Sequence, residues 1–182
     1  MLGSGQGLTL TLAPDIRLAS SKGIDAFALN VGRDDWQPAR VADAFAAAKY
    51  LDNGFQLFMS FDMASLPCAN DYDADVLMSY ITAYENHPNY LKYNRKMFVS
   101  TFSGQDCRFG TSSLNEGWAN AVKKGPDIHF VPAFFNNPAE FRGMTVMDGA
   151  FNVSCNYESF IAASFLNIVT FVVEFSLANG KL

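Results

Sequence analysis

Short, continuous runs of apolar residues alternate with amphipathic segments along most of the chain, from Asp15 onward. Runs such as residues 55–61 (FQLFMSF) are apolar on both faces, which is typical of parallel strands that are covered on both sides. Strand starts recur about every 20 to 40 residues, which leaves room for a helix between successive strands. The sequence therefore predicts an α/β fold with parallel strands, and the pattern alone fits both a barrel and an open doubly wound sheet.

The pattern places each element along the chain. We expect strands over residues 25–31, 55–61, 97–102, 128–134 and 144–147. We expect helices over residues 14–21, 74–85, 113–123 and 137–141, and another from Pro38 to the turn at Asn53-Gly54. The helix that opens at Pro38 is expected to bury a stripe formed by Val41, Ala42, Phe45, Ala46 and Ala48. Pro132 weakens the expected strand at 128–134, because proline cannot donate to a central hydrogen-bond ladder.

The composition indicates a folded globular domain or a part of one. The 182 residues are 49% hydrophobic and 17% charged, so a large buried interior is expected. The chain is nevertheless shorter than the ~250 residues of a typical complete (β/α)8 barrel. The phenylalanines that fall at predicted core positions are Phe45, Phe55, Phe61, Phe98 and Phe130.

Several function classes are excluded by charge and by missing motifs. The net charge of −5 and the scattered Lys and Arg residues provide no field for a phosphate backbone, so nucleic acid is not an expected partner. The chain has no G-x-G-x-x-G or G-x-x-x-x-G-K-[ST] motif, and its three cysteines have no zinc-type spacing. We therefore expect no cofactor and no metal. The N-terminal sequence MLGSGQGLTLTLAPD lacks the basic and apolar regions of a secretory signal.

Polar and aromatic residues follow the predicted strands, where parallel α/β folds place their ligands. These positions are Asn30, Asp62, residues 100–102 with Thr101 and Phe102, residues 134–136, and Asp148. Such a ring suits a sugar, because carboxylates and amides match hydroxyl pairs while Trp36, Trp118 or loop phenylalanines offer stacking surfaces. The alternative is purely structural, since Asp and Asn after a strand are also ordinary turn and N-cap residues. We assign His87 to a turn and His129 to strand packing.

The sequences around these strand ends resemble glycoside hydrolase family 71, the α-1,3-glucanases or mutanases that cut the α-1,3-glucan of fungal walls. The similar segments are DIRLASSKGIDAFALNVG (15–32), FQLFMSFDM (55–63), FVSTFSGQDC (98–107), GWANAVKKG (117–125), FVPAFF (130–135) and MDGAFN (147–152). The resemblance covers about residues 15–152. It implies that residues 1–152 form part of a (β/α)8 TIM-type barrel and that residues 153–182 are an atypical apolar tail.

The resemblance also implies a chemistry, namely hydrolysis with inversion by two carboxyl groups about 6.5 to 9.5 Å apart. Asp62 carries over as the catalytic-site carboxylate, important for binding or for supporting the catalytic pair. Asn30, Thr101, Phe102 and Asp148 carry over as its substrate-binding neighbours. The family's later motif resembling W-N-D-Y-G-E-S, with its natural acid and base, does not occur in this chain. A first strand resembling VFAHFMVG is missing as well. An α-1,3-glucanase-type domain that is truncated and inactive alone is therefore implied.

Further expectations rest on the same resemblance. The alternative function is a non-catalytic fragment that binds glucan, and a barrel enzyme acting on another glycan ranks third. The resemblance implies an extracellular or cell-wall location. In a secreted relative, Cys68 and Cys107 would lie in the loops after successive strands and could form a disulfide; the alternative is two buried thiols. A half barrel also has exposed strand edges, which predict aggregation.

The tail after Asn152 departs from the family pattern. Val153-Ser154 can be encoded by the consensus start of an intron, so we hypothesise a translated intron or an alternative splice product. Transcript reads that join codon 152 directly to a downstream barrel exon would establish the artefact, and retained reads alone would refute it. A membrane segment over residues 160–177 is the weaker alternative, because Glu174 and Asn167 interrupt a run of only about 18 residues.

Overall fold

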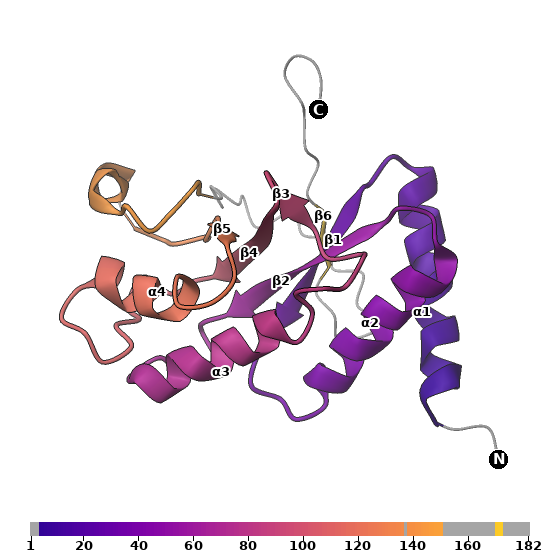
Figure 1. Cartoon of the computed structure of the whole chain (residues 1–182), viewed down its shortest axis with the longest axis horizontal. Coiled ribbons are helices and arrows are strands. Elements are labelled where there is room, and N and C mark those ends of the chain that lie inside the picture. The colour runs from indigo at the N-terminus through magenta and orange to yellow at the C-terminus, as the bar shows by residue number, and fades with distance from the viewer. Residues whose placement is uncertain (1–3, 137, 151–169, 173–182) are drawn as a thin grey trace.

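A computed structural model describes residues 4–136, 138–150 and 170–172. Strands and helices alternate along the chain, and four strands run parallel as neighbours in their order along the chain (Figure 1). These four strands are β1 (Ala26–Val31), β2 (Gln56–Asp62), β4 (Lys96–Phe102) and β5 (Ile128–Phe130). The predicted α/β class is confirmed.

One helix precedes β1, and three further helices connect the successive parallel strands. They are α1 (Ser4–Ser21), α2 (Gln37–Leu51), α3 (Asp71–Thr82) and α4 (Leu114–Val122). Figure 1 shows α2, α3 and α4 following one another along one side of the sheet, and α1 packs against α2. β1, β2 and β4 are thus each followed by a connection that returns the chain to the same end of the sheet, as parallel pairing requires.

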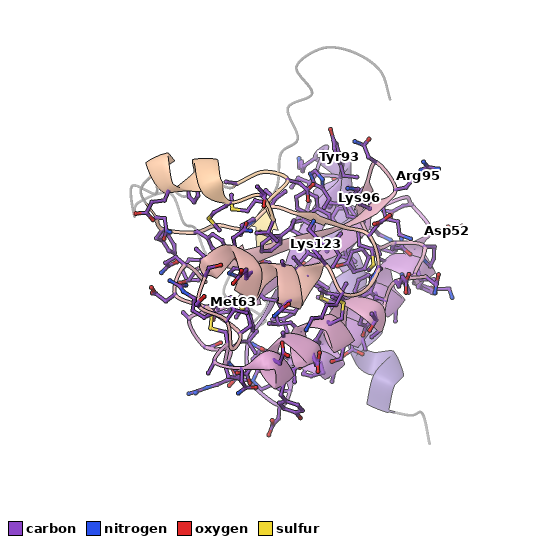
Figure 2. The ribbon with its side chains drawn as sticks, turned by 60° about the vertical axis from the view of Figure 1, so that its left-hand side comes forward. Asp52, Met63, Tyr93, Arg95, Lys96 and Lys123 are labelled. Atoms are coloured by element: carbon purple, nitrogen blue, oxygen red, sulfur yellow. A yellow bond between two sulfur atoms is a disulfide. The ribbon has the colours of Figure 1, made fainter. Side chains whose placement is uncertain are left out.

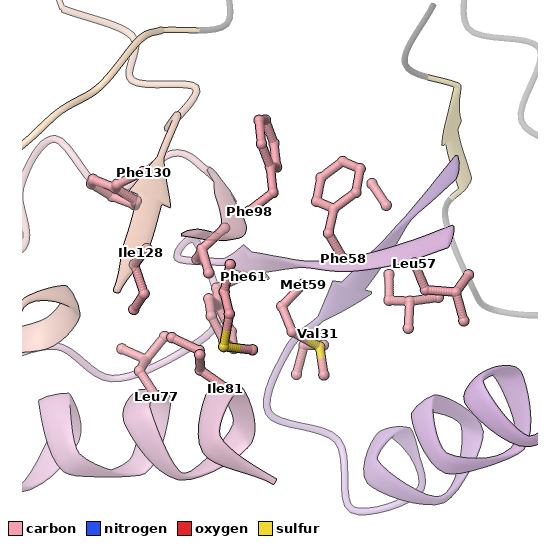
Figure 3. Close-up of a cluster of buried hydrophobic side chains, with 14 of the residues drawn as sticks. Val31, Leu57, Phe58, Met59, Phe61, Leu77, Ile81, Phe98, Ile128 and Phe130 are labelled. Atoms are coloured by element: carbon pink, nitrogen blue, oxygen red, sulfur yellow. The ribbon is translucent and has the colours of Figure 1, made fainter. Parts of the chain in front are cut away.

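The core lies between the sheet and this helical layer. Successive strand residues point to opposite faces, so Met59 and Phe61 of β2 face Leu77 and Ile81 of α3 (Figure 3). Phe58 and its neighbour Phe98 point to the other face, where their rings meet edge to face at 4.9 Å. Burial on both faces explains why β2 reads as a continuous apolar run rather than an alternating one.

Helix boundaries differ from the sequence prediction at several points. α1 begins at Ser4 instead of residue 14, so Pro14 lies inside the helix, where it removes one backbone hydrogen bond. α3 begins at Asp71 instead of residue 74, because Asn70 and Asp73 form a reciprocal capping box. On α2 the buried alanines include Ala44 and Ala47, whereas the predicted Ala42 and Ala46 are exposed. Alanine is too weakly apolar to fix the buried face by itself.

The expected strand at 144–147 is wrong. These residues form turns after the 3₁₀ helix η1 (Pro138–Gly143), which takes the place of the helix expected at 137–141. The strand at 128–134 is shorter than expected, because β5 ends at Phe130. Beyond it, the N–H groups of Val131 and Ala133 still donate to the carbonyls of Val99 and Thr101, and Ala133 forms a bridge with Phe102. Pro132 lies between these two donors, so its missing N–H falls on the side of the chain away from β4, where a strand can tolerate proline.

A hairpin that the sequence pattern did not predict starts β4. β3 (Lys92–Tyr93) pairs antiparallel with the beginning of β4, and the two turn residues Asn94 and Arg95 both have positive φ, at 49° and 68°. Two positive φ values in a two-residue loop match a type I′ turn. Just before β3, the fully buried Tyr90 donates its hydroxyl to the carbonyl of Phe98 at 3.2 Å, and burial raises its pKa, so the donor proton is retained.

One short strand comes from the tail. β6 (Thr170–Val172) pairs antiparallel with Phe27–Leu29 of β1. The remainder of the predicted tail from residue 153, which includes most of the alternative membrane segment at 160–177, lies outside the described residues. Within the described ranges, no helix combines the length and the apolar character that are needed to cross a membrane.

Candidate functional site

The candidate site is the carboxyl edge, which we define as the edge of the sheet where β1, β2, β4 and β5 end. Asp62 is the last residue of β2 and pairs with Phe102, the last residue of β4. Paired residues of neighbouring strands share a face of the sheet, so these two side chains lie side by side. Asn30 pairs with Ser60, two residues before Asp62, and therefore points to the same face.

Asp62 has one carboxylate oxygen engaged and one available. Oδ1 accepts a hydrogen bond from the N–H of Ala64 at 3.1 Å, and the backbone carbonyl of Asp62 accepts from Ser65 and Leu66. The side chain is half-buried, and no residue of the described part of the chain donates to Oδ2. The turn thus fixes the carboxylate in orientation and leaves an oxygen for a ligand.

Asn30 presents an unusual polar group on this face. Its Oδ1 is buried, and within the described residues it has no hydrogen-bond partner. Buried polar atoms in native proteins are nearly always hydrogen-bonded, so an atom of this kind is suited to a hydroxyl or water that completes it. Asn30 and Asp62 thus place two hydrogen-bond acceptors on the same face of the sheet, with Asn30 two residues further from the strand ends than Asp62.

Thr101 does not lie on the face that carries Asp62, where its place near a strand end predicted it. It stands between Ser100 and Phe102 on β4, so strand alternation turns its side chain away from the face that carries Asp62. The side chain is only 1% exposed, and its hydroxyl donates to the carbonyl of Ser103 at 2.9 Å. In this structure Thr101 supports the loop that follows β4 rather than lining the face.

Phe102 meets a second aromatic ring at the edge. The rings of Phe102 and Phe135 lie 5.3 Å apart at 77°, an edge-to-face contact, and Phe135 is 51% exposed. Gln105 lies beside them, since its Oε1 accepts from the N–H of Phe135 and from the hydroxyl of Ser103. Gln105 was missed by sequence reasoning, because it follows the strand by three residues and only the returning chain brings it to the edge.

The loop from Ser103 to Gly110 is held by α4. The indole N–H of the fully buried Trp118 donates to the carbonyl of Gly104 at 3.0 Å, and Gly104 adopts a φ of 110°. A side chain on Gly104 would come within 2.7 Å of the Trp118 ring, so only glycine fits there. Trp118 is therefore part of the support and not the exposed stacking surface that the sequence analysis considered.

Cys68 and Cys107 form a disulfide between the loops that follow β2 and β4. Their Cα atoms are 5.2 Å apart, and the carbonyl of Cys68 accepts from the N–H of Phe109 at 2.9 Å. The predicted pairing is confirmed, and the alternative of two thiols is wrong for this structure. The bridge ties together the two loops whose strands carry Asp62 and Phe102.

Asp148 is engaged at the side of β5. Its carboxylate accepts from the N–H of Phe130 at 2.9 Å and pairs with Lys123 at 3.3 Å, while its own N–H donates to the carbonyl of Phe130. Burial raises the pKa of Asp148, but the Phe130 hydrogen bond and the Lys123 charge outweigh it and hold the pKa below its ordinary value. These contacts place Asp148 beside Phe130, which is level with Val99 of β4 and Met59 of β2. Asp148 therefore does not lie next to Asp62, where it was predicted.

The two predicted histidine roles agree with their contacts. His87 lies in a turn, where its Nδ1 accepts from the N–H of Asn89 at 3.2 Å, and burial lowers its pKa. His129 on β5 packs against the rings of Tyr93 and Phe98.

Comparison with known proteins agrees with this geometry. The sequence matches glycosyl hydrolase family 71 over residues 8–160, which is most of the chain. The chain belongs to glycosyl hydrolase family 71. Among its relatives, glucan endo-1,3-alpha-glucosidase agn1 of Schizosaccharomyces pombe is 42% identical over 125 residues, and the ascus wall endo-1,3-alpha-glucanase of the same yeast is 34% identical over 125 residues. Mutanase Pc12g07500 of Penicillium rubens is 30% identical over 139 residues.

The family 71 chain spans only part of these relatives. The matches to the two yeast proteins cover 66% of this chain, that to the mutanase covers 76%, and each covers 28% of the relative. Among solved structures, the GH99 endo-alpha-mannosidase of Bacteroides thetaiotaomicron superposes with a TM-score of 0.62 at 14% identity, covering 87% of this chain and 46% of the mannosidase. That likeness shows the fold, a partial (β/α)8 TIM-type barrel.

The disulfide is expected to contribute substantially to stability. It closes a loop with a sequence separation of 39, for which the chain-entropy relation gives about 4 kcal/mol. The double variant Cys68→Ser/Cys107→Ser should therefore melt roughly 8 to 16 °C lower than the wild type. Reductant should lower the wild-type melting temperature by a similar amount and leave the double variant unchanged. Equal melting temperatures for the two proteins would contradict the bridge.

The environment of Asp148 predicts a pH-dependent stability. The pKa of Asp148 is lower in the folded protein than its ordinary value of 3.8. The ionised carboxylate therefore stabilises the folded state at pH values above 3.8, and this stabilisation is lost as the pH falls through the folded-state pKa. Asp148→Asn should therefore be less stable than wild type in urea at pH 7, and the difference should shrink below about pH 4. A difference that stays constant from pH 7 to pH 3 would show that the carboxylate charge is not the cause.

Proposed function

We propose that this chain is the part of an α-1,3-glucanase-type glycoside hydrolase that binds the glucan at the carboxyl edge, with Asp62 as the site carboxylate. The observation that carries the proposal is the adjacency of Asp62 and Phe102 at paired strand ends in a family 71 chain. A carboxylate beside an aromatic ring provides both contacts that a neutral sugar needs, an acceptor for hydroxyl groups and a surface for the apolar ring face. The relatives named above as 1,3-alpha-glucanases indicate the linkage.

Asp62 has the geometry of a working carboxylate. Its Oδ1 is fixed by the N–H of Ala64, and its Oδ2 accepts no hydrogen bond within the described residues, so the carboxylate enters a complex already oriented. Inverting hydrolysis needs a second carboxyl group about 6.5 to 9.5 Å away, with room for a water molecule. Among the last residues of the four parallel strands, Asp62 is the one carboxylate. We therefore propose that the chain binds glucan and that hydrolysis requires the acid and base motif that its sequence lacks.

The alternative function is a non-catalytic glucan-binding fragment. The observation that favours it is the state of Asp148, whose carboxylate is taken by Lys123 and by the backbone of β5. A carboxylate that neutralises a lysine is a poor general acid, because its pKa is lowered rather than raised.

An extracellular or cell-wall location also belongs to this proposal. The Cys68–Cys107 disulfide supports it, because disulfides form and persist in oxidising compartments and are rare in reducing ones. An enzyme in the cell wall or outside the cell would also have direct access to a polysaccharide of the fungal wall.

The test is binding and cleavage of α-1,3-glucan by the full chain and its Asp62→Asn variant. The wild type should be retained on insoluble α-1,3-glucan, and Asp62→Asn should bind at least about tenfold more weakly, because hydrogen bonds to charged groups are strong. Asp52→Asn is the matched control, since Asp52 is exposed at the end of α2 with a φ of 47° that asparagine tolerates. Asp52 lies well away from Met63, the neighbour of Asp62 (Figure 2).

Two results would contradict the proposal. Equal retention of wild type and Asp62→Asn would remove Asp62 from the site. Release of reducing sugar by the wild type, lost in Asp62→Asn, would show that the chain already holds a complete catalytic pair.

A further inference from the structure

Next to Asp62, the carboxyl edge carries an aromatic pair whose outer member is open to solvent. Phe102 is half-buried at the end of β4, and Phe135 is 51% exposed after the Ala133 bridge to Phe102. Their edge-to-face contact at 5.3 Å orients the Phe135 ring although much of its surface is bare. Exposure of a large apolar ring to water is unfavourable, so a ligand whose apolar surface covers the ring gains binding free energy.

The amide of Gln105 is oriented by its contacts. Its Oε1 lies 3.4 Å from the backbone nitrogen of Phe135 and 3.2 Å from the hydroxyl oxygen of Ser103. A backbone N–H can only donate, so the atom facing it must be the amide oxygen. The Nε2 group is thereby left with two hydrogens to donate, and within the described residues it donates no hydrogen bond.

The backbone that carries Gln105 is held in a rarely adopted shape. Ser103 has a φ of 62°, which is uncommon for a residue other than glycine, and its N–H donates to the carbonyl of Ala133 at 3.1 Å. Trp118 and the Cys107 disulfide hold the following residues. Backbone strain of this kind persists where the surrounding structure enforces it, and it keeps Gln105 beside Phe135 without a ligand.

The charge pattern around the pair favours a neutral ligand. Arg108 donates its Nη1 to the carbonyls of Gln105 and Cys107. The pair and Gln105 then contribute two hydrocarbon rings and a neutral amide donor, and the charge beside them is the carboxylate of Asp62. That combination lacks the charge-assisted donors that anionic ligands require and matches a hexose, which has an apolar ring face and peripheral hydroxyl groups.

We propose that Phe102, Phe135 and Gln105 form a pyranose-binding subsite immediately beside Asp62. The glucosyl ring covers Phe135, and Gln105 Nε2 donates to one of its hydroxyl groups. This inference rests on the proposed function, since it names where a glucan residue next to the one at Asp62 is held. The subsite sets the direction in which the glucan chain leaves Asp62, across the ends of β4 and β5.

The test measures binding of soluble α-1,3-linked gluco-oligosaccharides to the full chain by isothermal titration calorimetry. Phe135→Ala should weaken binding about tenfold, and Phe135→Tyr should restore it, because the ring is retained. Gln105→Glu should weaken binding about fivefold, since it keeps the oxygen that accepts from Phe135 and loses the donor. Tyr93→Ala is the matched control, and it should bind like wild type. Tyr93 is 48% exposed, but it lies on β3 beside the start of β4, far from Met63 (Figure 2).

The outcomes separate this inference from the proposed function. If Asp62→Asn binds weakly while Phe135→Ala and Gln105→Glu bind like wild type, the subsite is wrong and the proposed function stands. If Tyr93→Ala weakens binding as much as Phe135→Ala, the effect is not local and the subsite is also wrong. Wild type that binds no α-1,3-linked oligosaccharide overturns both. Far-ultraviolet circular dichroism of each variant confirms that the comparison is between folded proteins.

Discussion

The burial of one indole ring connects the sheet, the helical layer and the candidate site. Trp118 on α4 has no exposed surface and contacts the rings of Phe109, Phe130 and Phe134. Its N–H holds the carbonyl of Gly104, so the loop after β4 is fixed by the same residue that packs α4 onto β5. Without this anchor, the aromatic pair and Gln105 would lose their common support.

The parallel register then decides which side chains can act together. Pairing of Asp62 with Phe102 puts a carboxylate and an aromatic ring next to each other on one face, and Asn30 joins that face one layer deeper. The same alternation turns Thr101 toward the opposite face. The proposed glycan-binding surface is thus built from strand ends of only modest polarity, because the register brings them together where the parallel strands end.

The two outermost parallel strands of the sheet, β1 and β5, are partly covered by other segments of the chain. β6 covers residues 27–29 of β1, although a closed barrel would place a parallel strand there. On the other side, Asp148 takes both backbone hydrogen-bonding groups of Phe130. These contacts oppose the strand-to-strand association that an open half barrel invites, and aggregation of the chain stays a prediction.

The sequence alone determined the α/β alternation, the positions of β1, β2 and β4, the family, and the place of Asp62 at a strand end. These features follow from local periodicity and from motifs, which are properties of adjacent residues. Only the tertiary structure decided the burial of Thr101, the return of Gln105 to Phe135, the pairing of Asp148 with Lys123 and the loss of a strand at 144–147. Each of these depends on contacts between residues far apart along the chain, and a local pattern encodes the period of an element but not its partner.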